Sequence, residues 1–209
     1  MTIIPSVEDW NFSQNFLDED ASILKAREKA KELNIQAIGS GVGAVLRFLA
    51  STIDASNVVE IGTGTGVSGL WLFKGMNSAG VLTSIDSDPE RQRASKEIFN
   101  QSQIPATKVR LIAGKALEVV SRLTDNAYDL VFINGDKLEY ESLLDESMRL
   151  LRPGGILIYH NVLNDSQFKS DPDNLAIQRV IQKIKDEPRL VSVMIPNGTG
   201  IIACSYRPN

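Results

Sequence analysis

Five short apolar runs, rich in β-branched residues, punctuate the middle of the chain. They are separated by longer segments of mixed polarity and lie at 57–61, 81–85, 108–113, 128–134 and 155–160. Short runs of this kind are typical of strands that are buried on both faces of a parallel sheet. We therefore expect five parallel strands in this part of the chain.

The segments between these runs carry helical patterns. Asp88-Pro-Glu90 supplies an N-cap residue, a proline at the first helical position and an acid in the first turn, which predicts a helix to about Asn100. Further helices are expected at 115–123, at 138–151 before Arg152-Pro-Gly-Gly155, and at 173–186. Strand alternating with helix predicts a doubly wound α/β fold.

Both ends of the chain depart from this alternation. After a loop-like first dozen residues, helical spacing predicts one helix over 17–33, ended by Asn34, and a second to about Ile53, with Ser40 as a candidate cap. Near the other end, the runs 190–195 and 201–206 flank Pro196-Asn-Gly-Thr-Gly200 and leave no room for a helix. This pattern predicts a β-hairpin, so that one strand enters the sheet antiparallel. We expect a single domain over 1–209, with 1–53 as an N-terminal helical extension.

Composition narrows the classes of protein. The formal net charge is −4, which argues against a dominant nucleic-acid surface. Cys204 is the only cysteine, which excludes an intrachain disulfide and fits a reducing compartment. The N-terminus lacks the features of a signal peptide, and charge-free runs such as 33–46 are shorter than a membrane helix. We expect a soluble cytoplasmic protein with no membrane or nucleic-acid partner.

A glycine-rich loop carries the clearest chemical signal. The stretch Asn57-Val-Val-Glu-Ile-Gly-Thr-Gly-Thr-Gly66 runs from a strand into three alternating glycines, and Asp86 ends the next apolar run about twenty residues later. Glycine lets the backbone turn sharply and approach a ligand closely, and an acid at the second strand can accept hydrogen bonds from ribose hydroxyls. The combination predicts a nucleoside-containing cofactor.

Two hypotheses compete for the cofactor that this loop binds. The remaining alternative is a glycine-rich turn that binds no ligand. Gly64-Thr-Gly66-Val-Ser-Gly69 matches the G-x-G-x-x-G of NAD-dependent dehydrogenases. In that fingerprint the first glycine directly follows the strand and pyrophosphate lies at the helix N-terminus. Here the glycines begin at Gly62, and we expect Glu60 in the turn, where a carboxylate would repel pyrophosphate and attract an ammonium group.

The pattern E-x-G-x-G-x-G with a downstream acid resembles motif I of class I S-adenosylmethionine-dependent methyltransferases. Over roughly 35–206 the chain resembles their catechol and caffeoyl-CoA O-methyltransferase type, bacterial family 3, in the blocks Gly66–Leu72, Leu82–Glu90, Asp129–Lys137 and Leu151–Leu163. This resemblance implies a three-layer Rossmann-like methyltransferase fold. Its sheet would have seven strands, six parallel and one antiparallel near the C-terminus.

The resemblance also implies a cofactor site for S-adenosylmethionine. The glycines of the loop would pass the methionyl part, Ser68 would contact its carboxylate, Asp86 would hold the ribose, and 114–116 would lie near the adenine. The implied cofactor-binding residues are Glu60, Gly62, Gly64, Gly66, Ser68, Asp86, Gly114, Lys115, Ala116 and Asn134.

The residues at the expected catalytic site depart from the family pattern. Such enzymes hold a divalent cation with an Asp after strand 4 and an Asp-Asn pair after strand 5, and use a nearby Lys as base. The chain keeps Lys137 and Asn161 but has Asn134 and His160 at the two Asp positions. Mg²⁺ prefers carboxylate ligands, and imidazole favours ions such as Mn²⁺, Fe²⁺ or Zn²⁺. We therefore expect an altered or absent Mg²⁺ site, with Asn134, His160 and Asn161 as the only candidate ligands unless Asp136 contributes.

Several side chains can be interpreted in two ways. His160, the only histidine, is either a general base or a hydrogen-bonded replacement for an acid. Lys137 is either close to the substrate or an ordinary solvated lysine. Cys204 is expected to be a buried thiol rather than a nucleophile. For Trp10 and Phe12 we prefer a packing role over covering the acceptor pocket or forming a dimer contact. The loop 164–172 is expected to line the acceptor site.

The sequence therefore predicts an S-adenosylmethionine-dependent O-methyltransferase for a small hydroxylated acceptor, with Lys137 and His160 as catalytic candidates. The alternatives are an S-adenosylmethionine-binding protein without catalysis and, third, an NAD-dependent dehydrogenase. A homodimer is implied by the resemblance alone.

Overall fold

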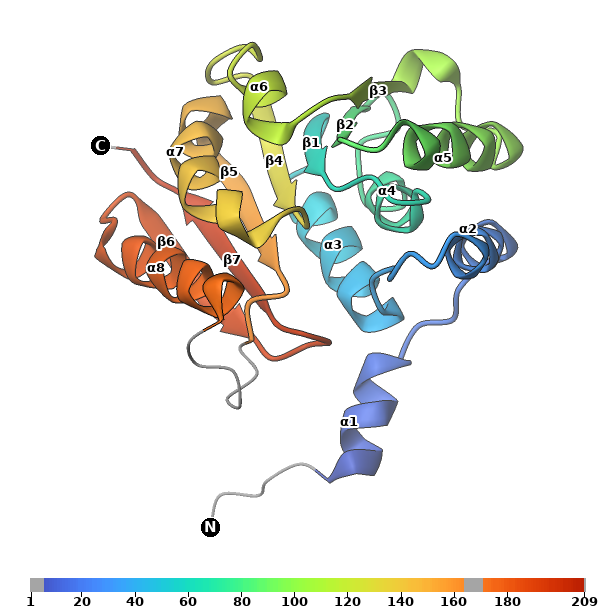
Figure 1. Cartoon of the computed structure of the whole chain (residues 1–209), viewed down its shortest axis with the longest axis horizontal. Helices are drawn as coiled ribbons and strands as arrows, with labels where there is room; N and C mark the ends of the chain where they lie inside the picture. Colours follow the sequence, from blue (N-terminus) through green and yellow to red (C-terminus); the bar gives the residue numbers. More distant parts are fainter. Residues whose placement is uncertain (1–5, 164–170, 209) are drawn as a thin grey trace.

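A single sheet organises the computed structural model, which describes residues 6–163 and 171–208 (Figure 1). The strand order is β3-β2-β1-β4-β5-β7-β6. The strands are β1 (Asn57–Ile61), β2 (Val81–Asp86), β3 (Val109–Ala113), β4 (Tyr128–Ile133), β5 (Leu151–His160), β6 (Leu190–Ile195) and β7 (Ile201–Tyr206). β1 to β5 pair in parallel, whereas β7 is antiparallel to both β5 and β6. The predicted six-plus-one arrangement is confirmed.

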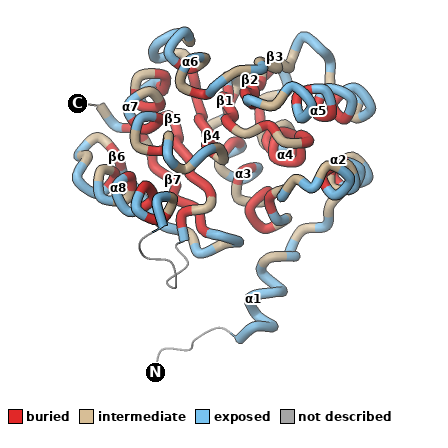
Figure 2. Tube along the Cα trace, viewed as in Figure 1, coloured by how far each residue is buried: buried red, intermediate tan, exposed pale blue. Residues whose placement is uncertain are grey.

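Helices cover both faces of this sheet, so the domain has three layers (Figures 1 and 2). The described helices are α1 (Val7–Gln14), which projects away from the sheet, and α2 (Ala21–Glu32), α3 (Ser40–Thr52), α4 (Val67–Phe73), α5 (Pro89–Gln101), α6 (Ala116–Val120), α7 (Tyr140–Leu150) and α8 (Pro172–Asp186), with the 3-10 turns η1 (Ala106–Lys108) and η2 (Lys137–Glu139). Side chains alternate between the faces along each strand. Val59 and Val131 pack in the core with α6, α7 and α8, and their neighbours Val58 and Leu130 pack with α2 to α5. Burial on both faces explains why the strands read as continuous apolar runs.

The loop-like assignment of the first dozen residues is wrong, because α1 occupies Val7–Gln14. Ser6 caps it, with the Asp9 amide donating to Ser6 Oγ at 3.1 Å and the Ser6 amide donating to Asp9 Oδ2 at 2.9 Å. The helix has no buried residue, and Phe12 is 71% exposed, so the preferred packing role for Phe12 is also wrong. The helix is tied to the body at its C-terminal end, where Gln14 accepts hydrogen bonds from Ser40 Oγ at 2.8 Å and from the Gly198 amide at 3.1 Å.

Element boundaries follow local capping chemistry. α5 begins at Pro89, and Asp88 Oδ1 accepts from the Glu90 amide at 2.8 Å, as predicted. Gly39 rather than Ser40 precedes α3 as its N-cap. α7 ends at Leu150, and Arg152-Pro-Gly-Gly155 lies inside β5 instead of separating helix from strand. Among the described helices, each is too short or too polar to cross a membrane.

Candidate functional site

Polar and glycine residues gather where four strands end at one edge of the sheet. Gly62 follows β1, Asp86 ends β2, Asn134 follows β4 and His160 ends β5. The strand order reverses between β1 and β4, and in open α/β sheets ligands bind in the crevice outside such a reversal. Asn134 lies at this point and lines each of the three cavities described below.

The first cavity has a volume of about 560 Å³ and lies between the ends of β1, β2 and β4. Six of the predicted cofactor-binding residues share its wall, namely Gly62, Asp86, Gly114, Lys115, Ala116 and Asn134. Asp86 is 6% exposed, and its two carboxylate oxygens accept from the amides of Gly64 and Asp88, both at 3.0 Å. These bonds fix the carboxylate at the cavity, where its remaining lone pairs can accept from hydroxyl groups.

The glycine loop needs glycine for two separate physical reasons. Gly62, Gly64 and Gly66 have φ values of 96°, 53° and 88°, a region that other residues rarely adopt. In addition, a Cβ on Gly62 would overlap the backbone carbonyl of Asn134. The loop and Ser68, which is 5% exposed, line a small second cavity of about 20 Å³ at the start of α4.

The expectation that Glu60 lies in the turn is wrong. This residue is the fourth of β1 and has 0% exposure. Its Oε2 accepts from Ser84 Oγ at 2.5 Å, Ser84 Oγ lies 2.7 Å from Thr63 Oγ1, and Gln92 Nε2 donates to Thr63 Oγ1 at 2.9 Å. Burial raises the pKa of Glu60 to about 7. The acid therefore lies beneath the glycine loop, in a buried chain of hydrogen bonds from β1 to α5.

This raised pKa predicts a pH-dependent stability. The folded protein holds the Glu60 proton up to about pH 7 and the unfolded chain releases it near the ordinary pKa of 4.5. Stability should therefore fall as pH rises between these values, by about 3 kcal/mol in total, and stay lower above pH 7. Relative to the wild type, Glu60→Gln should gain about this much stability between pH 4.5 and 8 in urea unfolding. The exposed acid variant Glu118→Gln is the control, and equal pH profiles for Glu60→Gln and wild type would refute the prediction.

The third cavity, of about 240 Å³, lies on the other side of Asn134. It is formed by the segment before α3, the first turns of α3, the end of β5 and the turn between β6 and β7. Its lining residues are Gln36, Ala37, Ile38, Gly39, Val42, Asn134, His160, Asn161, Gly198 and Thr199. The sequence pattern of the β6–β7 turn predicted a hairpin but did not indicate that Gly198 and Thr199 would reach the site. Residues 36–39 carry no motif, so their place in the cavity wall was not predicted either.

Four side chains form a hydrogen-bonded cluster at the floor of this third cavity. Asn134 Oδ1 lies 2.9 Å from His160 Nδ1 and accepts from Asn161 Nδ2 at 3.0 Å. Thr199 Oγ1 lies 3.2 Å from His160 Nε2 and also donates to Asn161 Oδ1. His160 is 5% exposed, and burial lowers its pKa to about 4. The imidazole is therefore neutral at physiological pH.

The divalent cation implied by the resemblance does not fit this donor set. Asn134 Oδ1 already accepts two hydrogen bonds, Asn161 Oδ1 accepts a third, and none of the four groups carries a negative charge. Asp136 does not supply the missing charge, because it lines the first cavity and its Oδ1 caps η2 through the Leu138 amide at 2.9 Å. In the described residues, His, Cys, Asp and Glu form no group of three that could hold a metal ion.

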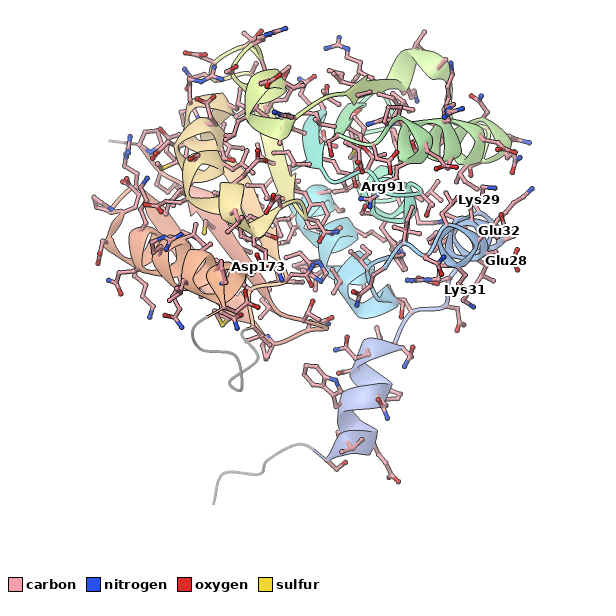
Figure 3. All side chains as sticks on the ribbon, viewed as in Figure 1. Glu28, Lys29, Lys31, Glu32, Arg91 and Asp173 are labelled. Carbon is pink, nitrogen blue, oxygen red and sulfur yellow. The ribbon has the colours of Figure 1, made fainter. Side chains whose placement is uncertain are left out.

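Lys137 is not part of this hydrogen-bonded cluster. It begins η2, and its Nζ is 3.2 Å from Oδ2 of Asp173, at the start of α8 (Figure 3). It is not among the residues lining the three cavities. Cys204 is 1% exposed in β7, with its pKa raised to about 12 by burial, which confirms a core thiol. Of the predicted acceptor loop, residues 164–170 lie outside the described part of the chain.

Comparisons with known proteins agree with this geometry. A family model described as O-methyltransferase matches residues 14–207. A protein of Mycobacterium sp. (strain JLS), provisionally named an O-methyltransferase, is 40% identical over 92% of this chain and 90% of its own length. A crystal structure from Corynebacterium glutamicum has a TM-score of 0.87 and 26% identity, with 95% of each chain covered. The Bacillus cereus O-methyltransferase, solved in complex with S-adenosylhomocysteine, has a TM-score of 0.86 and 22% identity over 97% of this chain and 100% of its own.

Proposed function

This chain belongs to the O-methyltransferase family, and we propose that it transfers a methyl group from S-adenosylmethionine to one hydroxyl of a small acceptor. The observation that carries the proposal is the position of Asn134, which separates the 560 Å³ cavity beside Asp86 from the 240 Å³ cavity beside His160. A methyl donor in one cavity and a hydroxyl in the other would meet at this residue. Membership of the family disfavours the dehydrogenase and the non-catalytic alternatives.

We assign S-adenosylmethionine to the first cavity and the glycine loop. Asp86 would accept from the ribose hydroxyls, the segment 114–116 would flank the adenine, and the methionyl end would follow Gly62 to Ser68. The B. cereus relative binds the demethylated product, S-adenosylhomocysteine, which supports the choice of cofactor. Glu60 would act from beneath the loop, because its carboxyl is fully buried.

The proposed chemistry needs the hydroxyl proton to leave as the new O–CH₃ bond forms. S-adenosylmethionine supplies a methyl group on a positively charged sulfur and leaves as S-adenosylhomocysteine. The acceptor oxygen becomes strongly acidic as it gains the methyl group, so even an imidazole whose pKa is about 4 can take its proton. The positive charge that disappears from sulfur then reappears on His160, and the total charge of the site is conserved. Lys137 remains a second candidate for this role, and its Nζ donates to Asp173 Oδ2.

Two measurements test the proposed function. Calorimetric titration with S-adenosylhomocysteine and with NAD should give heat for the first ligand only. Methyl transfer from labelled S-adenosylmethionine should then be screened over phenols and other hydroxylated acceptors, with EDTA, Mg²⁺ or Mn²⁺. We expect turnover that EDTA does not reduce. Absence of S-adenosylhomocysteine binding would refute the proposal.

Removing the Asp86 carboxylate should weaken the cofactor site without unfolding the protein. The ribose hydroxyls would lose charge-assisted hydrogen bonds, so Asp86→Ala should reduce S-adenosylhomocysteine affinity by about 2 kcal/mol, or ~30-fold. Asp88→Ala is the matched control, because Asp88 is a neighbouring acid that caps α5 and lies outside the first cavity. Equal affinities for the two variants would contradict the assignment of Asp86.

We also propose that the protein is a cytoplasmic homodimer. The support for the dimer is an exposed apolar surface at the N-terminus, where Val7, Phe12 and Phe16 are each at least 70% exposed. Surfaces of this kind are typical of protein contacts. Analytical ultracentrifugation of the whole chain and of a Phe12→Ser/Phe16→Ser variant tests the dimer.

A further inference from the structure

The hydrogen bonds around His160 point to a particular class of acceptor. We propose that Asn134, His160, Asn161 and Thr199 select an acceptor through one isolated hydroxyl, which donates to His160 Nε2, instead of through two adjacent hydroxyls chelated by a cation. This inference rests on the proposed function and names the substrate class of the same site. It replaces the cation of related enzymes with a neutral hydrogen-bonded cluster.

The hydrogen bonds of Asn134 determine the tautomer of His160. Asn134 Oδ1 accepts from Asn161 Nδ2 at 3.0 Å, and an amide oxygen can only accept. The His160 Nδ1 atom, 2.9 Å from the same oxygen, must therefore carry the ring proton. A neutral imidazole has one N–H, so Nε2 is left as an acceptor that faces the third cavity.

Around Thr199 the cluster offers more hydrogen-bond acceptors than donors. His160 Nε2 and Asn161 Oδ1 both accept, and the Thr199 hydroxyl, which contacts both, has a single proton. One of these two acceptors therefore receives no donor from within the cluster. A single hydroxyl from a substrate completes the set by donating to Nε2 while Thr199 donates to Asn161.

The wall of the third cavity offers few partners to a second hydroxyl on the acceptor. Apart from Gln36, the rest of the cavity wall consists of Ala37, Ile38, Gly39, Val42 and Gly198, which offer no side-chain polar group. A neighbouring hydroxyl on the acceptor would lose water without gaining a charged partner or a metal. Adjacent hydroxyls should therefore give no advantage in this site.

Because His160 is the only histidine, nuclear magnetic resonance can test the cluster directly. Untagged protein labelled with ¹⁵N-histidine gives one imidazole, whose long-range ¹H–¹⁵N correlations identify the tautomer. We expect the Nδ1–H form in the wild type and a mixture of tautomers in Asn134→Leu. Excess Mn²⁺ should leave the imidazole signals sharp. An Nε2–H form, which would result if both amides were reversed, or broadening by Mn²⁺ would overturn the proposal.

Ligand titration of the S-adenosylhomocysteine complex tests the acceptor class with two probes, phenol and catechol. Both should move the Nε2 resonance, with midpoints within about threefold of each other and no effect of Mg²⁺. Thr199→Val should leave both His160 Nε2 and Asn161 Oδ1 without a donor, so that catechol binds more tightly than phenol, whereas Thr199→Ser, which keeps the hydroxyl, should retain similar midpoints. A response to catechol alone, or none to phenol, would overturn the proposal. Failure of S-adenosylhomocysteine to bind would instead refute the proposed function, and the tautomer and Mn²⁺ results would still stand.

Discussion

Replacing Gly62 with alanine is expected to abolish measurable cofactor binding and to destabilise the fold. The residue follows β1 at φ 96°, and a side chain in this conformation costs about 1–3 kcal/mol. The added Cβ would also overlap the Asn134 carbonyl, and overpacking of this kind costs a further ~1–3 kcal/mol. Relief requires the glycine loop to move away from β4, which opens the junction between the cofactor and acceptor cavities. We expect at least about 100-fold weaker S-adenosylhomocysteine binding and a melting temperature lower by roughly 5–15 °C.

A matched glycine separates the two causes of this effect. Gly154 has a similar φ of 83°, but a Cβ there would meet no atom within 4 Å. Gly154→Ala should therefore show the cost of the backbone conformation alone, with unchanged cofactor affinity. Calorimetry and thermal unfolding of both variants measure the difference. If Gly62→Ala bound S-adenosylhomocysteine as tightly as Gly154→Ala does, the close approach of the loop to Asn134 would have no functional role.

The strands and most helices could be predicted because their signals are local. Burial on both faces makes each parallel strand a continuous apolar run, and Asp88-Pro89 marks the start of α5 by capping chemistry. The α1 helix was missed because it has no buried face, and therefore no apolar periodicity, and is marked only by the Ser6–Asp9 capping box. The early start of β5, at Leu151 instead of residue 155, was missed because strand pairing draws Arg152-Pro-Gly-Gly155 into β5.

The position of the site could be predicted, whereas its detailed contacts could not. Residues after successive parallel strands meet at one edge, so Gly62, Asp86, Asn134 and His160 converge as their spacing indicates. The burial of Glu60 depends on neighbouring strands and on Ser84, which lies 24 residues away. Thr199 reaches His160 from a hairpin 39 residues further along the chain. Such pairings are set by tertiary packing and leave no mark in a local motif.

Restoring two carboxylates to the cluster is expected to create a cation site where the wild type has none that fits. In the double variant Asn134→Asp/His160→Asp, two charged oxygen ligands would lie beside the Asn161 amide oxygen, which is the ligand chemistry that Mg²⁺ and Mn²⁺ prefer. Even at an effective dielectric constant of about 20, a unit charge pair at ~4 Å gains about 4 kcal/mol, and the cation is doubly charged. We therefore expect a gain of at least about 100-fold in Mn²⁺ affinity, or ~2.7 kcal/mol.

The same two charges should destabilise the cation-free protein, because like charges in a semi-buried site repel each other and are poorly solvated. The double variant should therefore melt below the wild type in EDTA and recover with Mn²⁺, whereas the wild type should not respond. Asn134→Asp alone is the control, because it adds one carboxylate instead of two and that carboxylate can accept from His160 Nδ1. Electron paramagnetic resonance titration of Mn²⁺ measures the affinities. If the wild type and the double variant bound Mn²⁺ equally well, the neutral cluster would not be what excludes the cation, and the two substitutions at 134 and 160 would have no bearing on the metal.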